Sequence, residues 1–338
     1  MKLRVYVALV LLAPFPCAAA EDIFDIRPVA DGVYAAIARP AYRVNSNAAI
    51  IILGDSVLVV DAESTPSAAR ALISQIKKLT PKPVQYLVNT HLHSDHSQGD
   101  EAYVRAWPGV EIVSTDATHA NIEQRGIPRW KHEIGAMPQE IEQLKTDRGQ
   151  AVGVEQKSAI QKNIVEAEAY LAELKTVHLI LPTLTFDRRQ VLHRGSRTVE
   201  LLWLGRAHTD GDVFVFLPAE KVLVSGDALH GWTPTMRDSF PYEWIKTLDA
   251  AEQLDFEYIV PGHGEVMRGK DKLALWKQFF HDLLDRTAAA YADGATMEEA
   301  KKRVSELLTP MYADKMEHFA RNIAGDVAKA YQVVNPSR

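Results

Sequence analysis

Three histidines and one aspartate fall within six consecutive positions, His91-Leu92-His93-Ser94-Asp95-His96. They directly follow the apolar run 84–88, whose alternation and β-branched and aromatic content predict a buried strand. At a strand end, side chains at i and i+2 point the same way, and the next turn brings i+4 and i+5 around from the other side. Imidazole and carboxylate groups suit a borderline divalent ion such as zinc, so the stretch predicts a metal site. The plainer alternative is a hydrophilic loop that happens to carry histidines.

The amino terminus has the pattern of a secretory signal peptide. Lys2 and Arg4 precede an apolar run over residues 5–12, and Ala18-Ala19-Ala20 provides the small residues of a cleavage site. We therefore expect residues 1–20 to be removed and the mature protein to be periplasmic or secreted. Cys17 is the only cysteine and would leave with this peptide, so the expected chemistry rests on His, Asp and water.

Charge and hydropathy exclude some classes of partner. The formal net charge is −6, and it becomes −8 without residues 1–20, which carry two basic and no acidic residues. A mildly acidic chain whose Lys and Arg residues are spread out is a poor candidate for binding nucleic acid. No later run reaches the ~18 apolar residues of a membrane span, so we expect no integral membrane span. A small-molecule substrate is the remaining expectation, and no oligomeric state is indicated.

The order of elements is that of an α/β protein. Alternating apolar segments flank Asp31-Gly32 and Gly54-Asp55, which predicts two pairs of strands. Thr65 as N-cap, with Pro66 at the first helical position, predicts a helix after them. Strands, a helix and a strand that ends in a ligand-rich loop place the function at strand ends.

Two segments are predicted to be mainly helical. Residues from about 117 to 177 are polar and helix-forming, and they carry apolar residues spaced for one helical face: Ile160, Ile164, Ala167, Leu171 and Leu174. We interpret this segment as a helical insertion that flanks or covers the site. Residues 270–338 form a predicted C-terminal helical segment. Residues 21–269, including the insertion, are assigned to one catalytic domain.

Three further motifs each follow a predicted strand. They are His208 within 205–212, Asp227 within Ser225-Gly226-Asp227, and His263 within Pro261-Gly262-His263-Gly264. Each has a glycine close to the candidate ligand, which lets the backbone turn sharply and approach a metal. A lone histidine after a strand is more often structural. Together, in order and at strand ends, these residues supply about the number of ligands that two metals need.

These residues resemble the ligand motifs of the metallo-β-lactamase superfamily of metallohydrolases. The resemblance covers roughly residues 24–268, with 117–177 as a departure from it. It implies an α/β fold, an αββα sandwich with the helical insertion and C-terminal helices added, and two Zn(2+) ions per chain at one edge. Carried over, the first metal would be held by His91, His93 and His208, the second by Asp95, His96 and His263, and Asp227 would bridge them.

Two further aspartates match the supporting carboxylates of that superfamily. Asp61 and Asp212 are expected to orient ligand histidines without binding the metal themselves. The alternative for each is an aspartate at a strand end that caps a helix or a turn.

The implied chemistry is hydrolysis. A hydroxide shared between two cations forms at neutral pH because the metals lower the pKa of bound water. One metal polarises a carbonyl or phosphoryl oxygen, the hydroxide attacks, and the second metal stabilises the leaving group. Asp95 is expected to be the catalytic residue that orients the hydroxide and shuttles its proton.

The substrate stays open among esters, lactones, thioesters and β-lactams. Export and a complete ligand set without cysteine resemble the dizinc subclass of β-lactamases. A bridging Asp227 instead resembles the thioesterase, lactonase and phosphodiesterase branches, and His230 stands where another β-lactamase subclass has a drug-binding lysine. The candidate pocket wall, unless some members are core, comprises Trp130, His230, Trp232, Tyr242 and Trp244.

Three hypotheses follow from these motifs. The first is an exported, zinc-dependent hydrolase with two metals, similar to β-lactamases. The second is a mononuclear iron persulfide-oxidising enzyme on the same fold, which would not need Asp95, His96 or His263. The third is a non-catalytic metal-binding protein. A nuclease is a fourth possibility, but the expected export of the protein and its negative net charge disfavour it.

Overall fold

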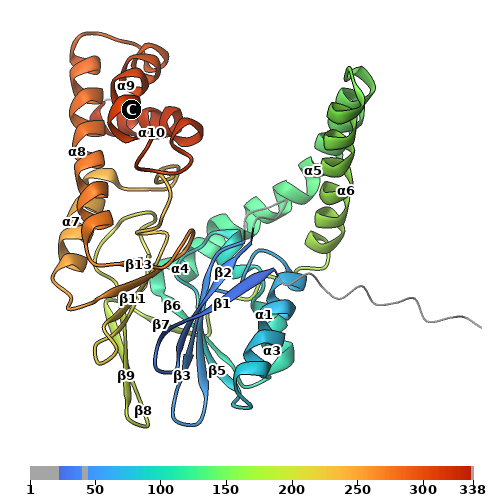
Figure 1. The fold of residues 1–338 in the computed structure, drawn as a ribbon, viewed down its shortest axis with the longest axis vertical. Helices are drawn as coiled ribbons and strands as arrows, with labels where there is room; N and C mark the ends of the chain where they lie inside the picture. Colours follow the sequence, from blue (N-terminus) through green and yellow to red (C-terminus); the bar gives the residue numbers. More distant parts are fainter. Residues whose placement is uncertain (1–22, 40–44, 336–338) are drawn as a thin grey trace, which may run out of the picture.

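The computed structural model of the protein describes residues 23–39 and 45–335, so the expected signal peptide lies outside the described residues. Two β-sheets pack face to face, and helices cover the outer face of each (Figure 1). This is the predicted αββα arrangement. Within the described ranges, no helix has both the length and the hydropathy of a membrane span.

The first sheet has seven strands in sequence order. The turn at Asp31-Gly32 joins the first antiparallel pair, as predicted, and the strands that lead to His91 and beyond run parallel. The strands are β1 (Phe24–Ala30), β2 (Val33–Ala38), β3 (Ala48–Ile52), β4 (Val57–Val60), β5 (Val84–Val88), β6 (Glu111–Thr115) and β7 (Leu184–Phe186).

The second sheet has six strands, in the order β13-β12-β11-β10-β9-β8. Its strands are antiparallel except for the parallel pair of β11 and β12, which both end at candidate ligands. The strands are β8 (Arg189–Arg194), β9 (Arg197–Leu202), β10 (Phe214–Leu217), β11 (Val222–Gly226), β12 (Tyr258–Pro261) and β13 (Met267–Arg268).

Three apolar layers hold the sandwich together. Between the sheets, Val60 and Val88 belong to the same buried cluster as Val215 and Val224. A second cluster packs helices α1 (Pro66–Leu79) and α3 (Asp100–Ala106) on the outer face of the first sheet. As predicted, α1 begins with Thr65, whose Oγ1 accepts a hydrogen bond from the Ala68 amide at 3.2 Å.

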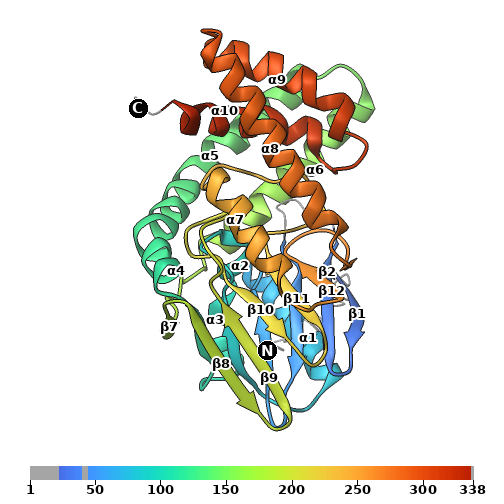
Figure 2. The ribbon, with the colours of Figure 1, turned by 90° about the vertical axis from the view of Figure 1, so that its left-hand side faces the viewer.

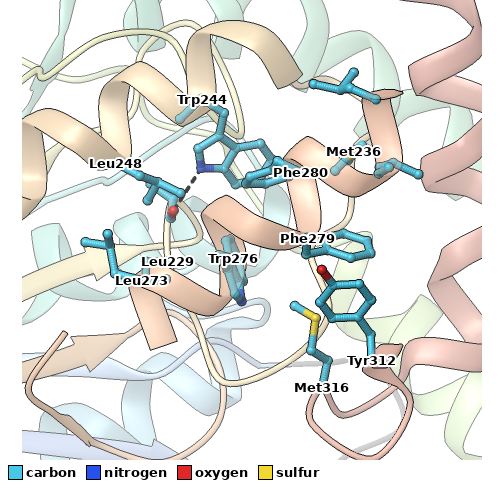
Figure 3. Packing of buried hydrophobic residues seen from close by; sticks show 14 of the residues in the cluster. Leu229, Met236, Trp244, Leu248, Leu273, Trp276, Phe279, Phe280, Tyr312 and Met316 are labelled. Carbon is cyan, nitrogen blue, oxygen red and sulfur yellow. Dashed lines mark hydrogen bonds between the residues drawn. The ribbon is translucent and has the colours of Figure 1, made fainter. Parts of the chain in front are cut away.

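The third layer packs helices on the second sheet. Helices α7 (Pro241–Glu252) and α8 (Asp271–Ala292) bury large aromatic side chains there, and Trp244, Trp276 and Phe280 lie against one another (Figure 3). Helices α9 (Met297–Tyr312) and α10 (Phe319–Val334) extend this cluster through Tyr312 and Phe319. The segment expected as C-terminal helices thus shares a core with the sandwich.

The segment expected as a helical insertion lies between β6 and β7. It contains α4 (Asp116–Asn121), a π-helical turn η1 (Ile122–Gly126), α5 (Ile127–Gln150) and α6 (Val154–Leu174). Helices α5 and α6 form a hairpin that projects from the sandwich (Figure 1). They pack through a cluster of their own that includes Met137, Ile164 and Leu171. Figure 2 shows this hairpin and α8–α10 at the same end of the two sheets.

Candidate metal centre

The first candidate ligands lie directly after β5. Two residues separate the end of this strand from His91, and His93 is the N-cap of the short helix α2 (Ser94–Ser97). The sequence predicts a loop here, and the structure has a single helical turn, which brings Asp95 and His96 to the same place. Backbone hydrogen bonds fix the turn, because the His96 carbonyl accepts from the Ala62 amide at 2.8 Å.

Three imidazole nitrogens from two separate loops form a close group. His91 Nε2 lies 2.9 Å from His93 Nδ1, and His208 Nε2 lies 2.9 Å from the same atom. His208 belongs to the loop that joins β9 to β10. These three residues form a group in which every ligand atom is within 4.8 Å of the others.

A second group lies beside the first. Asp95 Oδ2 is 3.5 Å from His96 Nε2 and 3.2 Å from His263 Nε2. His263 follows β12 in the second sheet, so both sheets contribute to this group. Asp95 is the most exposed of the seven candidate ligands, with 22% of its side chain accessible.

Asp227 lies between the two groups, at the end of β11. Its Oδ1 is 3.5 Å from His96 Nε2, and its Oδ2 is 3.6 Å from His208 Nε2 and 3.4 Å from His263 Nε2. One carboxylate therefore approaches histidines of both groups. The structure brings together all seven residues that the resemblance assigned to two metals.

In three of the candidate ligand histidines, His91, His93 and His96, the ring nitrogen that faces away from the centre has a partner. Thr90 Oγ1 donates to Asp61 and is 3.0 Å from His91 Nδ1, so it can accept from that ring. Asp61 Oδ2 is 2.7 Å from His96 Nδ1. Since a carboxylate only accepts, a proton stays on Nδ1, which leaves Nε2 as the atom of His96 that can bind a metal.

Asp61 therefore contacts a candidate ligand histidine, and its orienting role stays a prediction. Its backbone lies in the left-handed region, with φ of 67°, a conformation that an aspartate rarely adopts outside turns and functional sites. The second expected supporting carboxylate is different. Asp212 binds the amide and hydroxyl of Thr209, at 2.8 and 2.7 Å, and caps the turn after His208. These contacts match the alternative stated for Asp212, an aspartate that caps a turn, and no contact joins its carboxylate to a ligand histidine in the described part of the chain.

The close approach of two strand ends requires a glycine. A Cβ on Gly262 would overlap Asp227 Oδ1 and the backbone of Gly226. This overlap explains the glycine before His263. The same reason underlies the sequence-based expectation of a glycine near each candidate ligand, which is that the backbone must approach the centre closely.

The donor set fits metal ions. His96 Nε2 and Asp227 Oδ1 are buried and have no hydrogen-bond partner in the described part of the chain, which is costly for polar atoms unless they bind an ion. Burial lowers the pKa of His91 and His208, the latter to about 3, so both rings are neutral as metal ligands must be. Imidazole nitrogens with two carboxylates are the donors that zinc takes.

A cavity of about 880 Å³ opens over this centre. Trp130, His230 and Trp232 line it, and Trp232 stacks on His263 with ring centroids 4.6 Å apart and an interplanar angle of 11°. The expected pocket role of Trp244 and Tyr242 is wrong. Trp244 is completely buried in the core, where its Nε1 donates to the Ala228 carbonyl at 2.9 Å (Figure 3). Tyr242 is half exposed and lies outside the cavity lining.

Asp238 is a residue of the centre that sequence reasoning missed. Its Oδ2 is 2.9 Å from His93 Nε2, which fixes the proton on that nitrogen and leaves Nδ1 for the metal. Arg129 of the insertion binds the same carboxylate with both of its terminal nitrogens, at 2.7 and 2.8 Å, and Arg125 also contacts it. His93 and Asp238 are 145 positions apart, and no local pattern marks the pair.

A protein-family model identifies the family to which the chain belongs. Residues 41–263 match the model of the metallo-beta-lactamase superfamily, which is more than half of the chain. The chain belongs to the metallo-β-lactamase superfamily. The resemblance found in the ligand motifs is thereby confirmed, and the chain has the candidate metal sites of this superfamily.

Individual relatives are distant. A linear primary-alkylsulfatase from Pseudomonas sp. (strain ATCC 19151) is 23% identical over 296 residues, which cover 82% of this chain and 53% of that protein. The chain thus spans about half the length of this curated relative. Two solved structures share the fold. A metallo-beta-lactamase from Pontibacter korlensis has a TM-score of 0.56 at 17% identity, with 76% of this chain and 99% of that chain covered. The DIM-1 metallo-beta-lactamase has a TM-score of 0.54 at 15% identity, with 76% and 97% covered.

Proposed function

We propose that this protein is an exported hydrolase that binds two zinc ions and attacks the carbonyl group of an ester, lactone, thioester or β-lactam. The observation that carries the proposal is the position of Asp227 between the two ligand groups. Separations of 3.4 to 3.6 Å between its oxygens and the facing nitrogens suit ligand atoms that each lie about 2 Å from a shared ion.

The second ligand group favours two ions over one. A mononuclear iron enzyme on this fold would need His91, His93, His208 and Asp227 only. Asp95, His96 and His263 nevertheless hold three ligand atoms within 4.8 Å of one another, next to Asp227. A dinuclear centre needs this second ligand group for its second ion, whereas a mononuclear centre does not need it.

Zinc ions bound at these residues would supply a hydroxide at neutral pH and would polarise the bond to be cleaved. Asp95 lies where it can accept the proton of the attacking water. Burial raises the pKa of Asp95, but His96 and His263 outweigh burial and lower it to about 2, so the carboxylate is ionised at neutral pH. As the most exposed candidate ligand, it can accept a hydrogen bond from the attacking water and take its proton.

A second candidate reaction is the hydrolysis of sulfate esters with an alkyl chain. It is favoured by the similarity to an alkylsulfatase over 82% of this chain. The cavity also offers an apolar wall to such a chain, through Leu92, Ile122, Trp130 and Leu179. The attacking hydroxide and the ligands would be the same, and the bond that breaks would be that of a sulfate ester.

The test combines metal content with turnover. Mature protein is analysed for metals and assayed with a para-nitrophenyl ester, a lactone, a thioester, a chromogenic β-lactam and an alkyl sulfate. About two zinc ions per chain with turnover of one substrate would support the proposal and choose the bond. A single iron ion per chain without hydrolysis would favour the mononuclear iron persulfide-oxidising enzyme. Two metals with background rates on all substrates would favour a metal-binding protein.

Export needs its own experiment, because residues 1–22 lie outside the described part of the chain. The full-length gene is expressed in a Gram-negative host and the protein is recovered from the periplasmic fraction. Its first residue should be Glu21. A protein that keeps Met1 and stays in the cytoplasm would contradict export and leave the hydrolase assignment intact.

A further inference from the structure

The cavity over the centre has two unlike walls. The insertion supplies an apolar side, where Pro128 and Trp130 of α5 lie with Leu179. The loop after Asp227 and helix α10 also contribute to the lining, through Arg237 and Arg321 respectively. Arg321 lies outside residues 41–263, the part of the chain that matches the family model.

Helix α10 is fixed against the loop that borders the cavity. The Glu317 carbonyl accepts from both the amide and the hydroxyl of Thr233 at 2.8 Å, and Asn322 Nδ2 donates to the Thr233 carbonyl at 3.0 Å. Phe319 and Ile323 of the same helix are buried in the core. The backbone of Arg321 is therefore held in place at the cavity wall while its side chain is exposed.

The two arginines have unused hydrogen-bond donors. Within residues 23–39 and 45–335, the Arg321 guanidinium has no recorded hydrogen bond or ion pair. Arg237 has one contact, 3.5 Å from Nε to Asp238 Oδ2, and that carboxylate is already bound by Arg125, Arg129 and His93. Other arginines, such as Arg206 with Glu243, pair with a carboxylate at ordinary distances.

His230 does not compete for an anion. Its Nδ1 accepts a hydrogen bond from the Trp232 amide at 3.2 Å, and the ring is buried against Trp276. Both contacts hold the residue at the position of a drug-binding lysine within the protein, so we look to the two arginines of the lining for hydrogen-bond donors to an anion.

We propose that Arg237 and Arg321 form a subsite for an oxyanion, and that the substrate carries a carboxylate or sulfate group separated by an apolar segment from the bond that is cleaved. Guanidinium groups bind such oxyanions through paired, charge-assisted hydrogen bonds. The apolar segment would lie along Trp130 and Leu179. This inference rests on the proposed hydrolase function, because it names the class of substrate for the same site.

The test uses two esters that differ only in a terminal charge. They are the mono-para-nitrophenyl ester of adipic acid, which is anionic, and para-nitrophenyl hexanoate, which is neutral and has the same number of acyl carbons. Zinc-loaded wild type is compared with Arg237→Gln, Arg321→Gln and the double variant. In the double variant we expect the ratio of kcat/KM for the anionic ester to that for the neutral ester to fall about ten-fold or more.

The separate values of KM and kcat distinguish the loss of a binding contact from a general loss of activity. A subsite remote from the cleaved bond raises KM for the anionic ester and changes kcat little. Added salt should weaken the preference of the wild type for the anionic ester and should have less effect on the double variant. Arg70→Gln is the matched control, because Arg70 of α1 is exposed and lies outside the cavity lining.

An unchanged ratio in the double variant would overturn the subsite while leaving the hydrolase intact. If the wild type hydrolyses neither ester, the subsite is judged by calorimetric titration of metal-free protein with decanoate. Weaker binding to the double variant than to wild type would then support the subsite, and equal binding would overturn it. A failure of the subsite and a failure of the proposed function are thus distinguishable.

Discussion

Asp238 Oδ2 accepts a hydrogen bond from His93 Nε2 at 2.9 Å, and two arginines of the helical insertion bind the same carboxylate. The arrangement links a segment that differs from the family pattern to one candidate ligand of the first metal. Burial raises the pKa of Asp238, but the hydrogen bonds from His93 and Arg129 and the charge of Arg125 outweigh burial and keep it far below its ordinary value. An ionised Asp238 holds His93 in the ring form that can bind a metal.

The first prediction follows from this link. Asp238→Ala removes the acceptor for His93, so we expect zinc affinity at the first site to fall about ten- to a hundred-fold. Affinity is measured by competition with a chromogenic chelator. Asp255→Ala, which removes an exposed carboxylate paired with Lys221, is the control. Equal affinity of the Asp238 variant and the wild type would show that His93 is oriented without this partner.

Asp227 gives the second prediction. Asp227→Ala removes the carboxylate that approaches both ligand groups, so the variant should bind fewer than two zinc ions. Because even the loss of an outer partner costs about ten- to a hundred-fold, we expect kcat/KM to fall at least a hundred-fold. Metal analysis and turnover are measured on the same sample. Two retained zinc ions with near wild-type turnover would contradict the bridging role.

The candidate ligands could be recognised in the sequence because each lies close to the end of a predicted strand. His91, Asp227 and His263 follow short apolar runs, and the neighbouring glycines mark the backbone turns. The fold follows from the same runs, since parallel strands bring their carboxyl ends to one edge. Such signals need only a few consecutive residues.

Asp238 could not be predicted, because its partners are 109 to 145 positions away and are placed by the packing of the insertion. Trp244 was misassigned although the chain carries the relevant signal. Trp244, Leu248 and Ala251 have the i, i+4, i+7 spacing of a buried helix face, and all three are completely buried. Tyr242 is two positions earlier, so it points away from that face and toward solvent.

The third prediction contrasts a core tryptophan with a cavity tryptophan. Trp244→Ala opens a void in the cluster of α7 and α8 and should destabilise the fold by about 3–5 kcal/mol. Trp232→Ala removes the ring stacked on His263 and should act mainly on KM, because Trp232 is partly exposed in the cavity. Denaturant unfolding and steady-state kinetics are measured on both. A reversed pattern would contradict the assignment of Trp244 to the core.

The fourth prediction concerns protons released by metal binding. In metal-free protein, burial lowers the pKa of His263, but Asp227 and Asp95 outweigh burial and raise it to about 9. A metal ligand must be neutral, so zinc binding at about pH 7 should release this proton. Zinc affinity should therefore rise with pH through the pKa of His263. His96 should contribute in the same direction, because burial lowers its pKa but Asp61 and Asp95 outweigh burial and raise it well above the ordinary value.

Calorimetric titrations with zinc in buffers of different ionisation enthalpy count these protons. The matched variant His263→Asn should release about one proton fewer than wild type at about pH 7. Equal release by both proteins would mean that His263 is already neutral before zinc binds.

The fifth prediction concerns the stability of α10, which borders the cavity. Asp326 is buried there, its carboxylate accepts a hydrogen bond from the Met236 amide, and its Oδ2 has no recorded partner. Burial raises the pKa of Asp326 well above its ordinary value, against the effect of that hydrogen bond. Folding therefore takes up a proton at pH values between the unfolded pKa of about 3.9 and the folded pKa. The resulting stability is fully present below the lower value and is lost as pH rises toward the higher one.

Asp326→Asn removes this ionisation and keeps an oxygen that can accept from Met236. The variant should match wild type in Tm at about pH 4 and exceed it at about pH 8, both measured on metal-free protein. Asp314→Asn, at an exposed position after α9, is the control and should not reproduce this divergence. A difference of the same size at both pH values would place the effect in packing, because only ionisation of the buried carboxyl makes the difference grow with pH.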